Sequence, residues 1–150
     1  MTQEGSEERE FELRITDQFA KEYPLKILIV DDNKINQFFI IELLRKLGYQ
    51  VDTASNGSEA IDLQMQNCYN FICMDISMPI MDGIEATGRI RQSTTAFRQP
   101  YIAIMTANTH LHDRERCLQA GADEYIAKPV RVQTVKESLK SAFLSQSSNR

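Results

Sequence analysis

The sequence has no long apolar run and no excess of basic residues. Its most apolar stretch, Ile27–Val30, is far shorter than the ~20 residues that a membrane-spanning helix needs. A formal net charge of −4 at pH 7 argues against a surface that coats nucleic acid. We therefore expect the folded part of the chain to contact neither a membrane nor nucleic acid.

The chain is also poor in cysteine. Its three cysteines, Cys68, Cys73 and Cys117, are odd in number and widely spaced. This is not the pattern of a disulfide framework or a metal site, so we expect reduced thiols. The acidic and polar segment Met1–Glu10 does not resemble a secretory signal, and no repeat of about 20–50 residues occurs. These features predict a cytoplasmic location.

What remains is the composition of one soluble globular domain. The 150 residues are 42% apolar and 25% charged, which argues against disorder of the whole chain. Residues 1–23 are predicted to be a flexible tail or linker, residues 24–144 the folded domain, and residues 145–150 a polar C-terminal tail. Phe11–Tyr23 carries scattered apolar residues and could instead form a short linker helix closed by Pro24.

Short apolar runs alternate with helical patterns between the two tails. The runs predict strands at residues 25–30, 50–54, 70–74, 101–105 and 124–127, the first of them buried on both faces. Helices are predicted at residues 35–47, 56–66, 82–92, 111–120 and 132–143. Capping residues mark several helix ends: Asn56 with Glu59, Asp82 with Glu85, Gly48 and Gly121. This alternation predicts an α/β fold, a five-stranded parallel sheet with helices on both faces.

Polar residues follow four of the five predicted strands. They are Asp31, Asp32, Asp75, Thr106 and Lys128. Each of them alone is a weak signal, because an Asp after a strand is usually a cap or turn residue. The parallel sheet, however, brings the carboxyl ends of its strands to one edge, where such folds bind their ligands. We therefore expect these five side chains to share one site.

Their chemistry suits a phosphoryl group. Three carboxylates in one cleft repel one another and need a counter-charge, and oxygen ligands select a hard cation such as Mg²⁺. A metal ion, an ammonium and a hydroxyl are the groups that neutralise and position a transferring phosphoryl group. One of the carboxylates could then be the nucleophile that accepts it.

Five motifs carry a family resemblance: IVDDN at 29–33, MDISMPIMDG at 74–83, MTAN at 105–108, AGAD at 120–123 and AKP at 127–129. On these motifs, the segment from Leu25 to about Phe143 resembles a response regulator receiver domain. It is most similar to the receivers of hybrid histidine kinases, because of DDNKINQ at 31–37 and MTAN at 105–108. The resemblance implies a doubly wound, flavodoxin-like sheet with strand order 2-1-3-4-5.

The resemblance also implies a role for each residue of the site. Asp75 would be the phosphoacceptor. Mg²⁺, or Mn²⁺, would be bound by Asp32, by Asp75, by the backbone carbonyl of Ser77 and, mostly through a water, by Asp31.

The same resemblance implies the switch residues. Thr106 would hydrogen-bond the phosphoryl group and move toward it, and Lys128 would pair with its oxygens. Tyr125 would turn inward when Thr106 moves. The peptide bond before Pro129 would be cis, which proline allows at low cost.

Two further positions are predicted to tune dephosphorylation. Ser77 and Asn108 lie two residues past Asp75 and Thr106, and the resemblance implies that they flank the attacking water. We hypothesise that the uncharged Asn108 orients this water poorly and prolongs the phosphorylated state. The alternative is that Asn108 only caps the next helix.

The first predicted helix has apolar residues on two sides. Its core face is expected to carry Phe39, Ile40, Leu43, Leu44 and Leu47. Ile35, Phe38 and Ile41 lie on the opposite flank, where polar residues are usual, so they form a candidate docking patch for a helix of a partner. The alternative is that residues 11–23 cover this patch.

Two other groups of polar residues have simpler interpretations. Arg89, Arg91 and Arg98 are expected on a solvated face of the domain. His110 and His112 have no third ligand at a suitable spacing, so they are predicted to be surface histidines and not a metal site.

We therefore predict a phosphoryl-accepting switch domain of two-component signalling, not an enzyme with a separate substrate. Its partners would be a sensor histidine kinase or a histidine phosphotransfer domain, and the domain could be tethered to a membrane-bound kinase. A phosphatase with an Asp nucleophile needs a second acid two residues later, where this chain has Ser77. A phosphorylation-independent interaction module is the other alternative, and it predicts loss of Asp75, Asp32 or Lys128, all of which are present.

Overall fold

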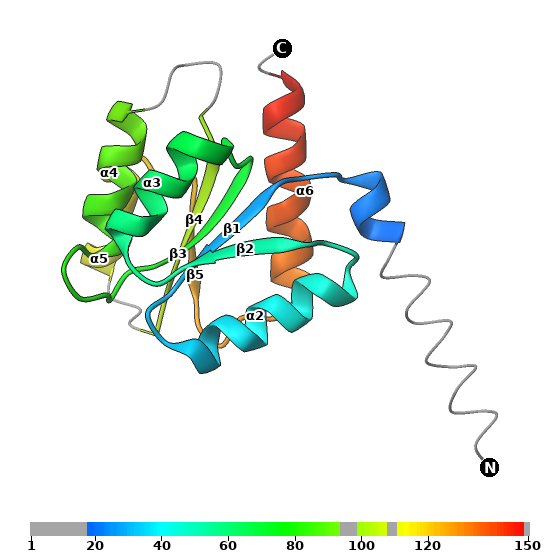
Figure 1. Cartoon of the computed structure of the whole chain (residues 1–150), viewed down its shortest axis with the longest axis horizontal. Coiled ribbons are helices and arrows are strands. Elements are labelled where there is room, and N and C mark those ends of the chain that lie inside the picture. The colour runs from blue at the N-terminus through cyan, green and yellow to red at the C-terminus, as the bar shows by residue number, and fades with distance from the viewer. Residues whose placement is uncertain (1–17, 94–98, 108–110, 149–150) are drawn as a thin grey trace.

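Five strands form one parallel sheet in the computed structural model, which describes residues 18–93, 99–107 and 111–148. The strand order is β2-β1-β3-β4-β5 (Figure 1). The strands are β1 (Ile27–Val30), β2 (Val51–Ala54), β3 (Phe71–Asp75), β4 (Tyr101–Thr106) and β5 (Glu124–Ala127). The predicted α/β fold and its strand order are confirmed.

Five helices cover the two faces of this sheet. They are α2 (Lys34–Lys46), α3 (Gly57–Asn67), α4 (Gly83–Ser93), α5 (Leu111–Ala120) and α6 (Val132–Ser148). Helices α3, α4 and α5 gather on one face, and α2 and α6 lie on the other (Figure 1). The sheet is therefore doubly wound, as the alternation predicts.

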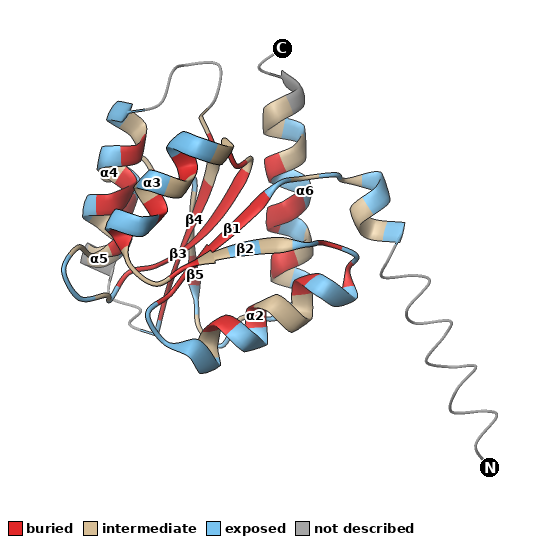
Figure 2. Cartoon of the chain, viewed as in Figure 1, coloured by how far each residue is buried: buried red, intermediate tan, exposed pale blue. Residues whose placement is uncertain are grey.

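The central strands β1, β3 and β4 are buried on both faces, so the molecule has two cores, whereas the edge strands β2 and β5 are partly open (Figure 2). Along β1, Ile27 and Ile29 pack with α2 and α6, whereas Leu28 and Val30 pack with α3, α4 and α5. This alternation follows from the two-residue period of a strand. The uninterrupted apolar runs in the sequence are thus explained by helices on both sides.

Strand ends differ from the prediction by one or two residues. Strand β1 begins at Ile27 and not at Leu25, while β3 continues to Asp75 and not only to Met74. The ladder between β3 and β4 explains the longer β3, because Asp75 is still paired with Met105. Asp75 is therefore fixed by the sheet and does not belong to a loop.

The C-terminal helix is longer than predicted. Helix α6 runs to Ser148, so the expected tail at residues 145–150 is helical over most of its length. The polar side chain of Gln146 explains this extension, because its amide donates to the carbonyl oxygens of Gln99 (3.1 Å) and Asn70 (3.5 Å). Polar residues here attach the helix to the ends of the strands.

Part of the predicted N-terminal tail belongs to the fold. Residues 18–22 are helical, and the amide of Ala20 donates to the carbonyl of Leu47 (3.0 Å). The ring of Phe19 lies 4.9 Å from that of Tyr23 and 6.5 Å from that of Tyr49, centroid to centroid. The Tyr49 hydroxyl donates to the carbonyl of Tyr23 (2.6 Å). Residues 18–23 therefore cover the C-terminal end of α2, and residues 1–17 lie outside the described part.

Helix α2 turns a narrower face to the core than predicted. Its buried residues are Gln37, Ile40 and Leu44, whereas the ring of Phe39, predicted to be in the core, is 67% exposed. Ile41, predicted to be on the open flank, is half-buried against the core. The prediction failed because apolar residues surround most of this helix, so periodicity alone does not locate the buried stripe.

Arg91 is not on a solvated face. Its guanidinium donates to the carbonyl oxygens of Gly121 (2.8 Å) and Pro100 (2.7 Å), and it forms an ion pair with Asp123 (2.8 Å). Arg89, in contrast, is 57% exposed and pairs with a glutamate of its own helix. Arg98 lies outside the described residues. Arg91 thus joins α4 to the loops at the start of β4 and β5.

No helix in the described ranges is both long and apolar enough to cross a membrane.

We predict that Phe19→Ala lowers the free energy of unfolding by about 1–2 kcal/mol, because it removes a half-buried ring from the cluster that attaches residues 18–23. The matched control is Phe38→Ala, which truncates a ring that is 59% exposed and should change stability by less than about 0.5 kcal/mol. Urea denaturation measures both. Equal effects of the two substitutions would contradict the docking of this segment.

Candidate functional site

The five polar residues that follow the strands meet at one edge of the sheet. Asp31 and Asp32 directly follow β1, Asp75 ends β3, Thr106 ends β4, and Lys128 directly follows β5. Strands β1, β3, β4 and β5 are neighbours in that order, and all of them are parallel. The topology therefore brings together residues that are almost a hundred positions apart in the sequence.

The three carboxylates form a compact cluster. One oxygen from each of Asp31, Asp32 and Asp75 lies within 4.8 Å of the other two. Asp31 is fully buried and Asp75 is 6% exposed, whereas Asp32 is exposed and opens the cluster to solvent. A set of oxygen ligands at this separation could hold a hard divalent cation.

Lys128 supplies the positive charge of the cluster. Its ammonium nitrogen lies 3.2 Å from Asp75 Oδ1 and 3.5 Å from Asp31 Oδ2. Its backbone amide donates to the carbonyl of Thr106 (2.8 Å), which ties the residue after β5 to the end of β4. The peptide bond between Lys128 and Pro129 is cis.

The single ammonium group of the site does not offset its three carboxylates. Burial raises the pKa of the Asp75 carboxyl, Lys128 lowers it, and Asp31 and Asp32 raise it again, so that the pKa lies above its ordinary value. The ionised form of Asp75 is therefore disfavoured by the fold. A divalent cation would favour that form, and the all-oxygen donor set fits such an ion.

The turn between β1 and α2 is fixed by side-chain hydrogen bonds. Asn33 is the N-cap of α2, and its side-chain oxygen accepts from the amides of Ile35 (2.9 Å) and Asn36 (3.1 Å). Asp31 Oδ1 accepts from the amide of Asn33 (2.9 Å). Gln37 was not among the predicted site residues, yet its buried amide donates to the carbonyl of Asp31. The feature of the sequence that could have indicated this role is the helical spacing that places Gln37 in line with the apolar residues Ile40 and Leu44.

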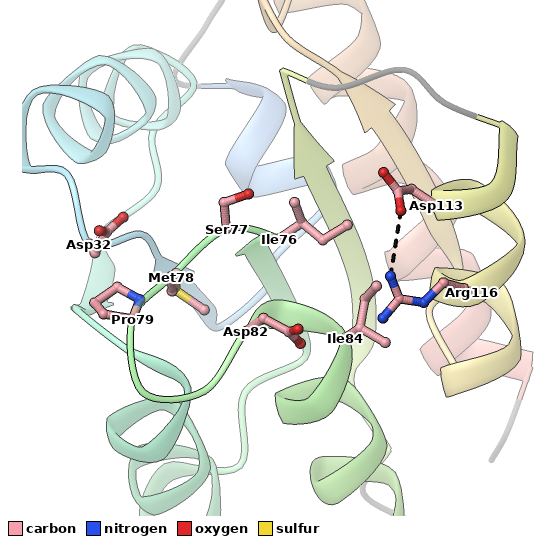
Figure 3. Close-up of a pocket in the computed structure, with 9 residues that line it drawn as sticks. All are labelled: Asp32, Ile76, Ser77, Met78, Pro79, Asp82, Ile84, Asp113 and Arg116. Carbon is pink, nitrogen blue, oxygen red and sulfur yellow. Dashed lines mark ion pairs between the residues drawn. The ribbon is translucent and has the colours of Figure 1, made fainter.

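The loop between β3 and α4 forms the other wall of the site. It lines an open cleft of about 460 Å³ that includes Asp32 and Ser77 (Figure 3). The loop leads into Gly83, the first residue of α4, where a Cβ would collide with the carbonyl oxygen of Asp75. Ile80 in this loop has a φ of 74° and is 87% exposed, an unfavourable backbone conformation for a β-branched residue.

Asp82, at the end of this loop, caps α4. Its side-chain oxygen accepts from the amide of Glu85 (2.8 Å), as the capping-box spacing predicts. On the far side of the cleft, Asp113 pairs with Arg116 (3.6 Å) (Figure 3). Asp82 therefore serves the helix and is not a member of the carboxylate cluster.

The predicted switch residues lie on neighbouring strands. Thr106 is 2% exposed at the end of β4. Tyr125, in β5, is half-buried and packs against the core on the α3–α4–α5 side, and burial raises the pKa of its hydroxyl. Asn108, the proposed lifetime residue, and His110 lie outside the described residues, as does the side chain of His112.

An exposed apolar surface lies beside the site on α2. Ile35 is 67% exposed and Phe38 59% exposed, so residues 18–23 do not cover them. Ile41, the third residue of the predicted patch, is half-buried against the core, whereas Phe39 is exposed. We define the α2 surface as Ile35, Phe38 and Phe39.

A mostly apolar groove continues from the α2 surface to the site. It has a volume of about 620 Å³ and runs from α2 to the segment after β5. Phe39 and Leu43 line one side of this groove, and Lys128, Pro129 and Val130 line the other. A partner bound in it would thus touch the residue whose ammonium group contacts Asp75.

We predict that Asp75→Asn raises the free energy of unfolding of the metal-free protein at neutral pH. It removes a carboxylate whose ionised form the fold disfavours. Because the folded-state pKa of Asp75 is raised, this gain should fade as the pH falls toward the unfolded-state pKa, where Asp75 is protonated in both states. Urea denaturation with a chelator measures it.

The control for this substitution is Lys128→Ala, which should have the opposite sign because it leaves three carboxylates without their ammonium group. An Asp75→Asn protein less stable than wild type at neutral pH would show that the carboxylates are not in conflict.

Comparison with known proteins identifies the family. Residues 27–140 match the model of the response regulator receiver domain. The sensor histidine kinase RcsC of Escherichia coli K12 is 37% identical over 115 residues, which are 77% of this chain and 12% of that protein. Hybrid signal transduction histidine kinase H of Dictyostelium discoideum is 40% identical over 128 residues, 81% of this chain and 9% of that protein. The chain thus spans only a small part of these relatives.

Solved structures agree with this result. The receiver domain of sensor histidine kinase PA1611 from Pseudomonas aeruginosa, with a magnesium ion in its active-site cleft, matches with a TM-score of 0.72 at 38% identity and covers 79% of this chain and 97% of that one. A CheY-like receiver domain protein from Methanospirillum hungatei matches with a TM-score of 0.75 at 27% identity, over 83% and 98%. The sheet order, the site at its carboxyl edge and these matches together show that the chain belongs to the response regulator receiver domain family of two-component signalling.

Proposed function

We propose that this domain accepts a phosphoryl group on Asp75 from a phosphohistidine of a partner protein, in a reaction that requires Mg²⁺ or Mn²⁺. The observation that carries the proposal is the contact between Asp75 and Lys128 (3.2 Å) inside a cluster of three carboxylates. A nucleophile beside an ammonium group and a cation site is the arrangement that phosphoryl transfer needs.

The roles that we propose for the chain's residues are those that the resemblance to receiver domains implies. A carboxylate oxygen of Asp75 forms the new bond to phosphorus, while the bond to the histidine nitrogen breaks and the imidazole keeps the electron pair. Lys128 would neutralise the phosphoryl oxygens, and the Thr106 hydroxyl would donate to one of them. Asp32, Asp75 and the Ser77 carbonyl would hold the cation directly, and Asp31 would hold it mostly through a water. The cation, when bound, would offset the negative charge of the reacting groups.

The phosphorylated domain would act as a switch. A phosphoryl group at Asp75 favours an arrangement in which Thr106 moves toward it and Tyr125 turns inward, so that the surface around β4 and β5 changes. Ser77 and Asn108 would then set how fast water removes the group. Cys73 and Cys117 are buried and form no disulfide, which fits a reducing compartment such as the cytoplasm.

The partner would be the phosphorylated helix-bearing domain of a sensor histidine kinase or a histidine phosphotransfer domain. An amphipathic helix places apolar residues into grooves of this kind. The α2 surface and its groove present Phe39 at one end and Lys128 at the other. A helix bound there could therefore bring its phosphohistidine to Asp75.

We predict that wild-type protein incubated with Mg²⁺ and acetyl phosphate gains the mass of a single phosphoryl group, which is lost at alkaline pH. Asp75→Asn should gain none, and a chelator should abolish the gain in wild type. Intact-mass spectrometry measures this. Modification of Asp75→Asn to the same extent would exclude Asp75 as the acceptor. Lack of both Mg²⁺ binding and the adduct would favour a phosphorylation-independent interaction module.

We predict that Phe38→Ala slows phosphotransfer from a phosphorylated histidine phosphotransfer domain at least tenfold, because it removes an anchor from the α2 surface. Its rate with acetyl phosphate should stay unchanged, because Asp75 and Lys128 are untouched. The matched control is Met65→Ala, which removes a 55% exposed apolar side chain from α3 on the opposite face of the sheet. Equal transfer rates for both variants would rule out docking through Phe38.

A further inference from the structure

Gln37 is a buried polar residue on the core face of α2. Its side chain is 4% exposed, and it lies in line with Ile40 and Leu44 at the spacing of a buried helical stripe. Its neighbours in the first turns of the helix, Ile35 and Phe38, are exposed. A glutamine at such a position needs hydrogen bonds that offset its desolvation.

Those hydrogen bonds go to the ends of two strands. The Gln37 amide donates to the carbonyl of Asp31, just after β1, and to the carbonyl of Ala54 (3.2 Å), the last residue of β2. The Ala54 carbonyl also accepts from the amide of Asp31 (3.1 Å). The backbone of Asp31 is thus held on both sides, through its own amide and through its carbonyl.

The same backbone unit carries two of the three carboxylates of the cation site. Asp31 is fully buried, with one carboxylate oxygen bonded to the amide of Asn33 (2.9 Å) and the other 3.5 Å from the Lys128 ammonium. Asp32 is the next residue, and its exposed carboxylate completes the cluster. A shift of the Asp31 carbonyl would therefore move both carboxylates relative to Asp75.

We propose that Gln37 is a positioning residue that sets the cation affinity of the site by fixing the backbone of Asp31 and Asp32. This role rests on the proposed function, because it assumes that the carboxylates bind Mg²⁺. Residues that orient metal ligands from outside typically contribute about 10–100-fold to metal affinity. We expect Gln37→Met, which keeps the length of the side chain and removes its donors, to weaken Mg²⁺ binding about tenfold.

The chain contains a matched control for this substitution. Gln64 in α3 is 1% exposed, accepts from the amide of Tyr69 (2.9 Å) and donates to its carbonyl (3.4 Å). These bonds lie between α3 and the segment before β3, at the opposite end of the strands from the cation site. Gln64→Met therefore removes a buried amide of the same kind without touching the carboxylates.

The test is titration of wild type, Gln37→Met and Gln64→Met with MgCl₂ by isothermal calorimetry, with circular dichroism to establish folding. Both variants should unfold at lower urea concentration than wild type, but only Gln37→Met should bind Mg²⁺ about tenfold more weakly, while Gln64→Met stays within twofold. Gln37→Asn, which keeps a polar group and shortens it by one methylene, decides the question if Gln37→Met does not fold.

The outcomes separate this role from the proposed function. Wild-type affinity in Gln37→Met, or an equal loss in both variants, overturns the positioning role and leaves the cation site intact. Failure of wild type to bind Mg²⁺ overturns the proposed function and this role together. Weakened binding in Gln37→Met alone supports both.

Discussion

Three carboxylates share one edge of the sheet, and the electrostatic cost of holding them together shapes the rest of the structure. The cluster carries three negative groups and one ammonium, so a divalent cation brings its formal charge to zero. The carboxylates cannot relax by moving apart, because Asp75 is paired in the central ladder and Asp31 is fully buried. The fold therefore holds the carboxylates in a mutually repulsive arrangement. A bound divalent cation would reduce this repulsion, so the position of Asp75 suits ligand binding better than it suits maximal stability.

Helix α2 lies between the carboxylate cluster and the protein surface. Its buried side carries Gln37, which is bonded to the backbone of Asp31, and its open side carries Ile35 and Phe38. A helix is rigid over such short lengths, so a displacement of the open side also displaces the buried side. A partner bound on the open side of α2 would therefore be separated from a cation between the aspartates by the width of one helix.

The sequence pattern was sufficient for the parallel sheet and for the edge at which Asp31, Asp32, Asp75 and Lys128 meet, while the resemblance supplied the strand order. It was not sufficient for the geometry at that edge. Alternating runs predicted five parallel strands, and parallel strands must bring Asp75 and Lys128 to one edge. The helix faces were harder to predict. Phe39 was expected in the core because apolar residues surround most of α2, and only tertiary packing decides which of them the sheet covers. The 3.2 Å contact between Lys128 and Asp75 depends on loop backbone that no periodicity describes.

One physical task is shared by three polar residues whose place in the fold the sequence did not indicate: Gln37, Arg91 and Gln146. A parallel sheet ends in backbone groups that its own ladder cannot satisfy, and buried polar side chains must pair with them. Gln37 does so at the carboxyl edge, while Arg91 and Gln146 do so at the amino edge through the carbonyls of Pro100 and Gln99. Within the described residues, no buried side-chain nitrogen or oxygen lacks a partner. Hydropathy predicts such polar residues to lie on the surface, yet their hydrogen bonds fix the ends of the strands. At the carboxyl edge of the sheet, the strand ends carry the residues of the site.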